Sequence, residues 1–204
     1  MGNSGNTFLA MNTPNFLTTL RVLLAFLTAV LLCAPFRFAA TAAFIVYCAA
    51  GATDWFDGYL ARRRNIVTTF GKFMDALSDK IMVSTAFLTL FALGMFGEWT
   101  GLALFCAVIS MSREFFVSGV RMLAASKGIV LAAERMGKYK AGFQMYSLGA
   151  VICARALDAD FSAGDSILRG VVFFSAMATL ALSTILSAWS GAMYGSRYSY
   201  LLKE

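Results

Sequence analysis

Long apolar stretches separated by short polar segments run along almost the whole chain. Six of these stretches are each close to the ~20 residues that an α-helix needs to cross a bilayer. They cover 15–34, 38–59, 73–95, 99–124, 140–157 and 167–189. The connections are short, and no internal repeat or low-complexity tract interrupts the series. The pattern therefore predicts an all-α, polytopic membrane protein with six transmembrane helices, folded as one domain over residues 1–204.

The composition agrees with a protein that is embedded in lipid. Hydrophobic residues make up 59% of the 204 residues, and charged residues only 14%. A soluble domain is usually about half apolar and about a quarter charged. The net charge of +6 would suggest nucleic acid as a partner of a soluble protein, but no basic stripe with interleaved aromatic residues is present. We therefore expect no nucleic-acid partner.

Positive charge is distributed unequally between the two sets of connections. One set holds Arg62, Arg63, Arg64, Lys72, Arg121, Lys127, Arg135, Lys138, Lys140, Arg197 and Lys203. The other set holds Arg37, Arg155 and Arg169, which are offset by Glu98, Asp158, Asp160 and Asp165. Because Lys and Arg accumulate on the cytoplasmic side, an even number of spans predicts that both termini are cytoplasmic. Whether Arg63 and Arg64 have a further function or only set this topology stays open.

We expect the first apolar stretch to be a membrane helix and not part of a cleaved signal peptide. "MGNSGNTFLAMNTPN" has no basic region, and the apolar stretch that follows is long. Residues 8–15, with Pro14 as a break, form either a short interfacial helix or part of a disordered tail. The four cysteines each lie alone in apolar runs, and there is no histidine, which argues against a soft-metal site.

The segment "ATDWFDGYLARRRNIVTTFGKFMDALSDK" concentrates acidic residues in this apolar chain. Asp54, Asp57, Asp75 and Asp79 are four of its eleven acidic residues. The first two are three residues apart near the cytoplasmic end of the second predicted helix, and the last two are four apart near the start of the third. Each pair therefore shares one face of its helix. A hairpin loop of about ten residues is expected to bring the two pairs opposite one another.

Four carboxylates this close together need a counter-charge. Two unit charges ~4 Å apart repel by ~4 kcal/mol even at an effective dielectric constant of ~20. Protonation or a bound cation must relieve this repulsion, and oxygen ligands without His or Cys select Mg²⁺, Mn²⁺ or Ca²⁺. Three residues of helix rise by ~4.5 Å, close to the spacing of the ions in two-metal sites, which attract phosphate oxygens.

Small residues lie on the same helix stripes as the acids. Gly58 and Ala61 follow Asp54 by four and seven residues, and Gly71 precedes Asp75 by four. Close helix packing is one explanation. Packing alone does not require acids on the same stripe, so we favour a flat polar ligand that lies against the backbone there.

The spacing D-x2-D-G-x2-A-R-x8-G-x3-D-x3-D resembles the signature of the CDP-alcohol phosphotransferase family. It is filled by Asp54, Asp57, Gly58, Ala61, Arg62, Gly71, Asp75 and Asp79. The resemblance implies a homodimeric six-helix enzyme that transfers a phosphate-bearing group from a CDP-linked donor to an alcohol and releases CMP. It also implies a bacterial inner-membrane location, with the active site facing the cytoplasm.

The same resemblance assigns residue roles and a cofactor. It implies two divalent cations, Mg²⁺ or Mn²⁺, held by Asp54, Asp57, Asp75 and Asp79, with Asp79 also acting as general base. It implies that the CDP-linked donor lies against Gly58, Ala61, Arg62 and Gly71. Asn15, Thr18 and Arg21, at intervals of three in the first helix, face the nucleotide in the family pattern, although helix capping is an alternative explanation for Asn15.

Basic residues in the second half of the chain suggest an anionic acceptor. Arg113 and Arg121 are eight residues apart in one predicted helix and can share a face, and Lys138 and Lys140 follow in "ERMGKYKAGFQM". A charge within a membrane span is costly and is usually functional. Fixed cations beside a metal site fit an acceptor that carries a phosphate, although snorkelling or positive-inside anchoring is an alternative.

These basic segments, with "TPNFLTTLR" near the N-terminus, resemble the family members that join CDP-diacylglycerol to sn-glycerol 3-phosphate. The resemblance implies phosphatidylglycerophosphate as the product and membrane lipid as the surroundings. Such members commonly have threonine where Ala141 stands. Another acceptor, such as inositol phosphate, is the alternative within the family. A cation-coupled transporter is the alternative from another class, but the acids lie at one membrane edge and no repeat is visible.

Overall fold

The structure is a computed structural model that describes the backbone of residues 13–64, 69–129, 131, 135–162 and 166–198. Side chains are described for 18–53, 74, 77–129, 131, 137, 139–162 and 166–198. Within this described backbone, six α-helices follow one another: α1 (Thr13–Cys33), α2 (Ala39–Arg64), α3 (Thr69–Ala92), α4 (Thr100–Ser126), α5 (Arg135–Phe161) and α6 (Ile167–Arg197). A short 3₁₀ helix, η1 (Gly97–Trp99), precedes α4. The described residues contain no strand, so the all-α prediction is confirmed.

Several helices are longer than the apolar stretches that predicted them. The helix α2 continues to Arg64, five residues past the apolar stretch, and α5 begins five residues early at Arg135. The helix α6 continues to Arg197. Backbone hydrogen bonding extends a helix through polar residues as readily as through apolar ones, so apolarity marks only part of each helix. The expected separation of about ten residues between the two helices is therefore wrong, since α2 ends at Arg64 and α3 begins at Thr69.

The prediction that Pro14 breaks the chain before the first helix is wrong. The helix α1 begins at Thr13, so Pro14 and Asn15 both lie in its first turn. Proline is tolerated there because the first N–H groups of a helix have no partner within the helix. Most of the segment 8–15 lies outside the described residues.

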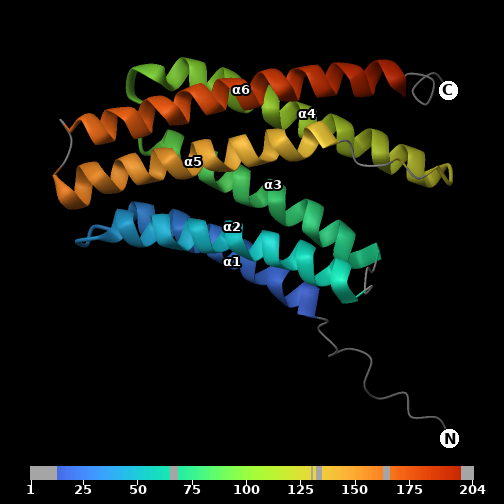
Figure 1. Cartoon of the computed structure of the whole chain (residues 1–204), viewed down its shortest axis with the longest axis horizontal. Coiled ribbons are helices and arrows are strands. Elements are labelled where there is room, and N and C mark those ends of the chain that lie inside the picture. Colours follow the sequence, from blue (N-terminus) through green and yellow to red (C-terminus); the bar gives the residue numbers. More distant parts are fainter. Residues whose placement is uncertain (1–12, 65–68, 130, 132–134, 163–165, 199–204) are drawn as a thin grey trace, which may run out of the picture.

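The helices form an up-and-down bundle in which chain neighbours do not always pack together (Figure 1). The helices α1 and α2 lie side by side, α5 packs between α2 and α6, and α4 packs on α6. The helix α3 crosses obliquely and contacts α1, α4 and α5. The start of α1 and the end of α6 lie at the same end of the bundle, as an even number of passes requires.

Close contact between α2 and α5 depends on small residues. A Cβ at Gly149 would lie 3.0 Å from the ring of Tyr47, whose hydroxyl donates a hydrogen bond to the carbonyl oxygen of Met145 at 3.0 Å. Where α2 begins and α5 ends, Asp160 accepts hydrogen bonds from the backbone N–H and the hydroxyl of Thr41, at 2.7 and 2.6 Å. The carboxylate of Asp160 thereby satisfies an otherwise unpaired N–H in the first turn of α2.

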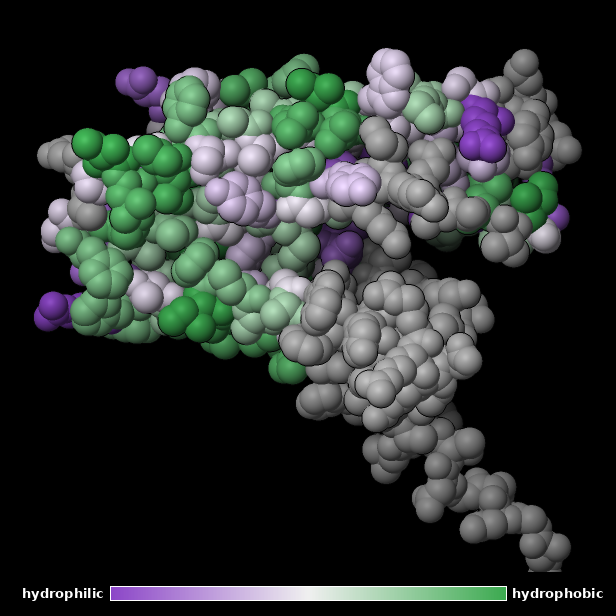
Figure 2. Space-filling model, in the orientation of Figure 1, coloured by the Kyte–Doolittle hydropathy of each residue, from purple (hydrophilic) through white to green (hydrophobic). Residues whose placement is uncertain are grey.

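Apolar side chains cover much of the described surface. Leu88 is 68% exposed, Ile185 66% and Phe105 62%. Figure 2 shows hydrophobic side chains gathered over the end of the bundle where α5 ends and α6 begins. Among the described residues, the segments 97–126 and 167–197 are each long and apolar enough to cross a membrane. These features indicate membrane association, whereas six spans and cytoplasmic termini stay predictions.

Candidate active site

Three of the four residues predicted to bind the acceptor phosphate line one cavity with the predicted general base. This cavity, named the catalytic cavity below for its predicted role, has a volume of about 170 Å³ and is bordered by α3, α4 and α5. Asp79 comes from α3, Arg113 and Arg121 come from α4, and Lys140 comes from α5. The structure thus brings together groups that are separated by up to 61 positions in the sequence, from 79 to 140.

Lys140 is held in the cavity by an ion pair with Glu114 of α4. The lysine is buried at 2% exposure, and the side chain of Glu114 is 18% exposed. An ammonium ion taken out of water costs several kcal/mol unless a counter-charge compensates it. Glu114 supplies that charge, and it also fixes the position of the ammonium group. The described residues offer this ammonium no second hydrogen bond, although it carries three N–H donors.

The side chain of Arg113, on α4, lies next to residues of α5 and α6. Its guanidinium donates a hydrogen bond from NH2 to the hydroxyl of Ser190 at 2.7 Å. A Cβ at Gly191 would lie 2.9 Å from the Cγ of Arg113, so only glycine allows α6 to pass this side chain without a shift. A Cβ at Gly137 would lie 4.0 Å from NH2 of the same guanidinium. Arg113 is therefore positioned by α6 while it faces the cavity.

Arg121 lies two helical turns beyond Arg113 and is exposed at the edge of the cavity. Its Nε donates a hydrogen bond to the hydroxyl of Tyr194 at 3.3 Å, and its guanidinium carbon lies 5.8 Å from the centroid of the same ring. Tyr194 is buried at 1% exposure, so it is a rigid support for this arginine. The prediction that Arg113 and Arg121 share a helix face is confirmed, since both line the cavity.

Thr18 and Arg21 do not line the cavity. Both are buried on α1, at 3% and 0% exposure. Arg21 donates a hydrogen bond from NH1 to the hydroxyl of Ser78 at 3.0 Å. Ser78 directly precedes Asp79, so α1 supports the turn of α3 that carries the predicted base. Contact of Thr18 or Arg21 with a nucleotide stays a prediction.

The remaining predicted site residues lie outside the described side chains, although their helices are described. Asn15 lies on α1 and Lys138 on α5. The helix α3 carries Gly71 and Asp75, and α2 carries Asp54, Asp57, Gly58, Ala61, Arg62, Arg63 and Arg64. Among the described side chains, no group of three His, Cys, Asp or Glu residues could hold a metal ion. Only Asp79 of the four predicted ligands belongs to that set. The donor chemistry fits a hard divalent cation, because every predicted ligand is a carboxylate.

Sequence reasoning missed Gln144, which lines the same cavity at 1% exposure. Its amide nitrogen has no hydrogen-bond partner among the described residues. Buried polar groups nearly always have partners, so an unsatisfied donor in a cavity indicates a place for a ligand or water. Gln144 is four residues after Lys140 and therefore shares its helix face. This spacing was the available signal, but a search for charged residues passes over an amide.

Lys80 was also missed, together with the α6 residues that support the two arginines. The ammonium of Lys80 donates a hydrogen bond to the hydroxyl of Ser118 at 2.6 Å and lies 5.4 Å from the ring centroid of Phe115. Lys80 adds a further cation to the lining of the cavity. Ser190 and Tyr194 carry no net charge and lie far from the aspartates in sequence, so no local pattern marks them.

Comparison with known proteins relates the whole arrangement to one family. A family model described as CDP-alcohol phosphatidyltransferase matches residues 11–189. The chain is 35% identical over 153 residues to the CDP-diacylglycerol–glycerol-3-phosphate 3-phosphatidyltransferase of Bacillus subtilis (strain 168), covering 69% of this chain and 76% of that protein. It is 32% and 31% identical over 183 residues to proteins of the same name from Salmonella choleraesuis (strain SC-B67) and Escherichia coli (strain K12), covering 89% of this chain and 94% of each relative. The chain therefore belongs to the CDP-alcohol phosphatidyltransferase family.

Proposed function

We propose that this chain transfers a phosphatidyl group from CDP-diacylglycerol to sn-glycerol 3-phosphate, giving phosphatidylglycerophosphate and CMP. The observation that carries the proposal is the shared cavity in which Asp79 faces Arg113, Arg121 and Lys140. An acid beside several fixed cations suits an acceptor that carries a phosphate at one end and a reacting hydroxyl at the other. The names of the relatives support the same reaction.

The cations of the cavity select for a phosphorylated acceptor. Arg113 and Arg121 present planar guanidinium groups that match phosphate oxygens, and Lys140 adds a point charge. Lys138 is proposed as a fourth contact. Serine lacks a phosphate and would leave these cations uncompensated. A volume of about 170 Å³ suits a small polar molecule better than a lipid, so the acyl chains of the donor must lie outside this cavity.

Asp79 is the proposed general base. It would accept the proton of the attacking acceptor hydroxyl, whose oxygen forms a new bond to the donor phosphorus that bears diacylglycerol. The bond from that phosphorus to the oxygen of CMP breaks, and CMP leaves with the bonding electrons. A carboxylate placed within hydrogen-bond reach typically contributes about 10²–10⁴-fold to such a proton transfer.

The pyrophosphate of the donor carries negative charge that must be neutralised while the acceptor attacks. Two divalent cations, Mg²⁺ or Mn²⁺, held by Asp54, Asp57, Asp75 and Asp79, would neutralise charge on the attacked phosphorus and on the leaving CMP. The small residues Gly58, Ala61 and Gly71 leave room for the cytidine nucleotide, and Asn15, Thr18, Arg21 and Arg62 are its proposed polar neighbours.

We propose that the protein is a single domain over residues 1–204, with six transmembrane spans and with both termini in the bacterial cytoplasm. It works in the inner membrane as a homodimer, with the cavity open to the cytoplasm. The exposed apolar surface of the helices supports lipid as its surroundings. The unequal distribution of Lys and Arg supports the orientation.

Purified protein in mixed micelles with CDP-diacylglycerol tests this function. CMP release and the lipid product are measured with sn-glycerol 3-phosphate, an inositol phosphate, serine or unphosphorylated glycerol as acceptor. We expect turnover with sn-glycerol 3-phosphate in Mg²⁺ or Mn²⁺ and very little with serine or glycerol. Faster turnover with the inositol phosphate would reassign the acceptor. Cation flux in sealed vesicles without CMP release would favour a transporter instead.

A further inference from the structure

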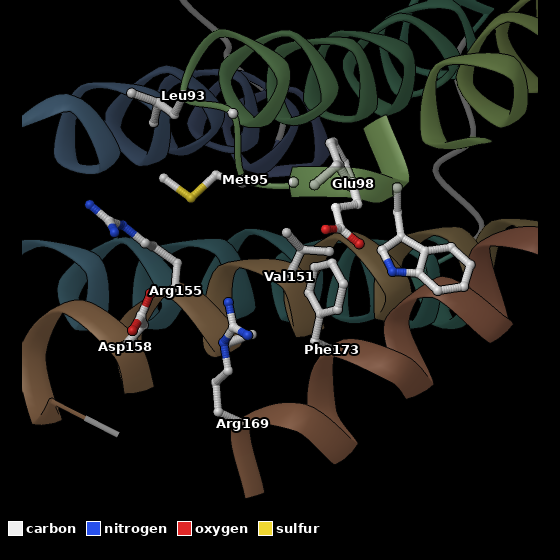
Figure 3. A pocket seen from close by; sticks show the side chains of 13 residues that line it. Leu93, Met95, Glu98, Val151, Arg155, Asp158, Arg169 and Phe173 are labelled. Atoms are coloured by element: carbon white, nitrogen blue, oxygen red, sulfur yellow. The ribbon is translucent and has the colours of Figure 1, made fainter. Parts of the chain in front are cut away.

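A second cavity, of about 390 Å³, lies at the other end of the bundle from the catalytic cavity. It is bordered by the connection between α3 and α4 on one side and by the end of α5 and the start of α6 on the other (Figure 3). Along α5, Lys140 and Arg155 are 15 residues apart, which corresponds to about 22 Å of helix. This distal cavity is therefore separate from the proposed catalytic machinery.

Four charged side chains line the distal cavity without pairing with one another. Glu98 reaches in from the α3–α4 side, while Arg155, Asp158 and Arg169 come from the opposite wall (Figure 3). No ion pair joins any of these four residues within the part of the chain that the structure describes. Glu98 and Arg155 are exposed and Asp158 and Arg169 partly exposed, so all four charges are accessible to a polar ligand that enters the cavity.

Arg169 indicates most directly that this cavity accommodates a ligand. Its Nε atom is buried and has no hydrogen-bond partner among the described residues. Its guanidinium carbon lies 5.6 Å from the ring centroid of Phe173, so the planar group is supported on one side by an aromatic ring. A guanidinium supported in this way still has several N–H donors available for an oxyanion such as phosphate.

The wall formed by the α3–α4 connection is fixed in shape. Gly94 and Gly97 have φ values of +63° and +51°, a conformation that residues with a side chain rarely adopt. Between them, Phe96 is buried at 1% exposure and its ring lies 4.8 Å from that of Phe91. Glu98 therefore extends from a turn that is anchored in the core.

We propose that the distal cavity binds the head group of a phospholipid that carries a phosphate and a primary ammonium, as in phosphatidylethanolamine. Arg155 and Arg169 would bind the phosphate, and Glu98 and Asp158 would accept hydrogen bonds from the ammonium. The two positive and two negative side chains match a zwitterion in net charge. A volume of about 390 Å³ falls within the range of small-ligand pockets, ~300–1,000 Å³.

The surroundings of the cavity favour a lipid over a soluble zwitterion. Ile167 and Leu168, which directly precede Arg169, are 86% and 61% exposed. Trp99 lines the cavity at 41% exposure, and its ring meets Phe174 edge-on with centroids 6.1 Å apart. Tryptophan is enriched at membrane–water interfaces, and exposed aliphatic side chains next to a head-group site would contact acyl chains.

The ammonium is expected to be primary because of the groups that would bind it. Glu98 and Asp158 are carboxylates, which bind N–H donors through charge-assisted hydrogen bonds. A quaternary ammonium is usually held by several aromatic faces. In this cavity, Arg169 already covers the ring of Phe173. We therefore expect phosphatidylcholine to bind more weakly than phosphatidylethanolamine.

Lipid binding to the full-length protein in detergent tests the proposal. The purified, delipidated protein is titrated with short-chain phosphatidylethanolamine, phosphatidylcholine or phosphatidylglycerol, and binding is followed by native mass spectrometry and by the rise in melting temperature. We expect phosphatidylethanolamine to bind most tightly. The double variants Arg155→Gln/Arg169→Gln and Glu98→Gln/Asp158→Asn should each lose about tenfold in affinity, as expected for lost hydrogen bonds to charged groups.

Arg37→Gln is the matched control, because Arg37 is exposed and does not line the distal cavity. It should bind lipid as the unchanged protein does. If a double variant unfolds, the single exposed change Glu98→Gln provides the same comparison. All variants should keep CMP release, so failure of this proposal is distinguishable from failure of the proposed function. Equal binding of all three lipids, equal binding by the variants, or no binding would overturn the proposal.

Discussion

The guanidinium of Arg21 on α1 and the hydroxyl of Ser78 on α3 are joined by a hydrogen bond of 3.0 Å. Both residues are completely buried, at 0% exposure. Because Ser78 directly precedes Asp79, this bond fixes the turn of α3 that carries the proposed general base. The first helix, which does not line the catalytic cavity with any described residue, thereby positions one of its walls.

We expect Ser78→Ala to lower both stability and turnover. The change removes one acceptor from a buried guanidinium, and a hydrogen bond to a charged group typically contributes about 1.5–3 kcal/mol. The melting temperature in detergent should fall, and kcat should fall because Asp79 is less well positioned. Ser126→Ala is the control, since Ser126 is exposed and its hydroxyl donates a hydrogen bond to the carbonyl oxygen of Leu123 in its own helix. Equal stability and kcat in both variants would refute a supporting role for Ser78.

Asp79→Asn tests the proposed general base. We expect CMP release to fall by about 10²–10⁴-fold, because an amide cannot accept the proton of the acceptor hydroxyl. Binding of CDP-diacylglycerol, measured by the rise in melting temperature, should persist. The acidic residue Glu98 at the far end of the bundle supplies the control variant, Glu98→Gln, which should turn over normally. Near-normal turnover by Asp79→Asn would remove this residue from the base role.

We expect changes to Glu114 and to Lys140 to have different effects: the first on stability alone, the second on stability and on acceptor recognition. Glu114→Gln should destabilise the protein, because removal of one partner of a buried pair typically costs about 3–5 kcal/mol. Lys140→Gln should in addition raise KM for sn-glycerol 3-phosphate, because the lysine is proposed to contact the phosphate. Unfolding in denaturant and steady-state kinetics on both single variants and the double variant measure the two effects. An unchanged KM in every variant would assign the pair a structural function alone.

Gln144→Leu should weaken acceptor binding without lowering stability. Leucine removes a buried amide nitrogen that has no partner among the described residues, so stability should be unchanged or higher. If the amide donates a hydrogen bond to the acceptor, KM for sn-glycerol 3-phosphate should rise by about tenfold. Thermal unfolding and kinetics measured on the same preparation test both expectations. A loss of stability with KM unchanged would contradict this assignment.

Removal of divalent cations tests the proposed ligand set. Complete chelation should abolish CMP release, and Mg²⁺ or Mn²⁺ should restore it, because carboxylate oxygens prefer hard cations. Asp57→Asn should require more metal for half-maximal rate than the unchanged protein. Melting curves recorded with and without Mg²⁺ give a readout that is independent of turnover. Activity that survives full chelation would contradict the two-metal proposal.

The helices were predictable because lipid imposes a simple pattern on the chain. Apolar stretches of about 20 residues mark each of the six helices, and their order along the chain is correct. The ends were less predictable, as at Arg64 and Arg135, where helices continue through polar residues. Backbone hydrogen bonds extend a helix regardless of side-chain polarity, so hydropathy alone does not show where it ends.

By itself, the sequence determined the six helices of the described residues, the family signature around Asp54 and Asp79, and the charged residues proposed to contact an acceptor. These features depend on spacing within one helix or one short segment, which the helical period makes readable. The tertiary structure decided that Gln144, Ser190 and Tyr194 join or support the catalytic cavity, and that Glu98 faces Arg169 across the distal cavity. Such contacts depend on how whole helices pack, and helix packing is set by the complementary shapes of many distant side chains rather than by any local pattern.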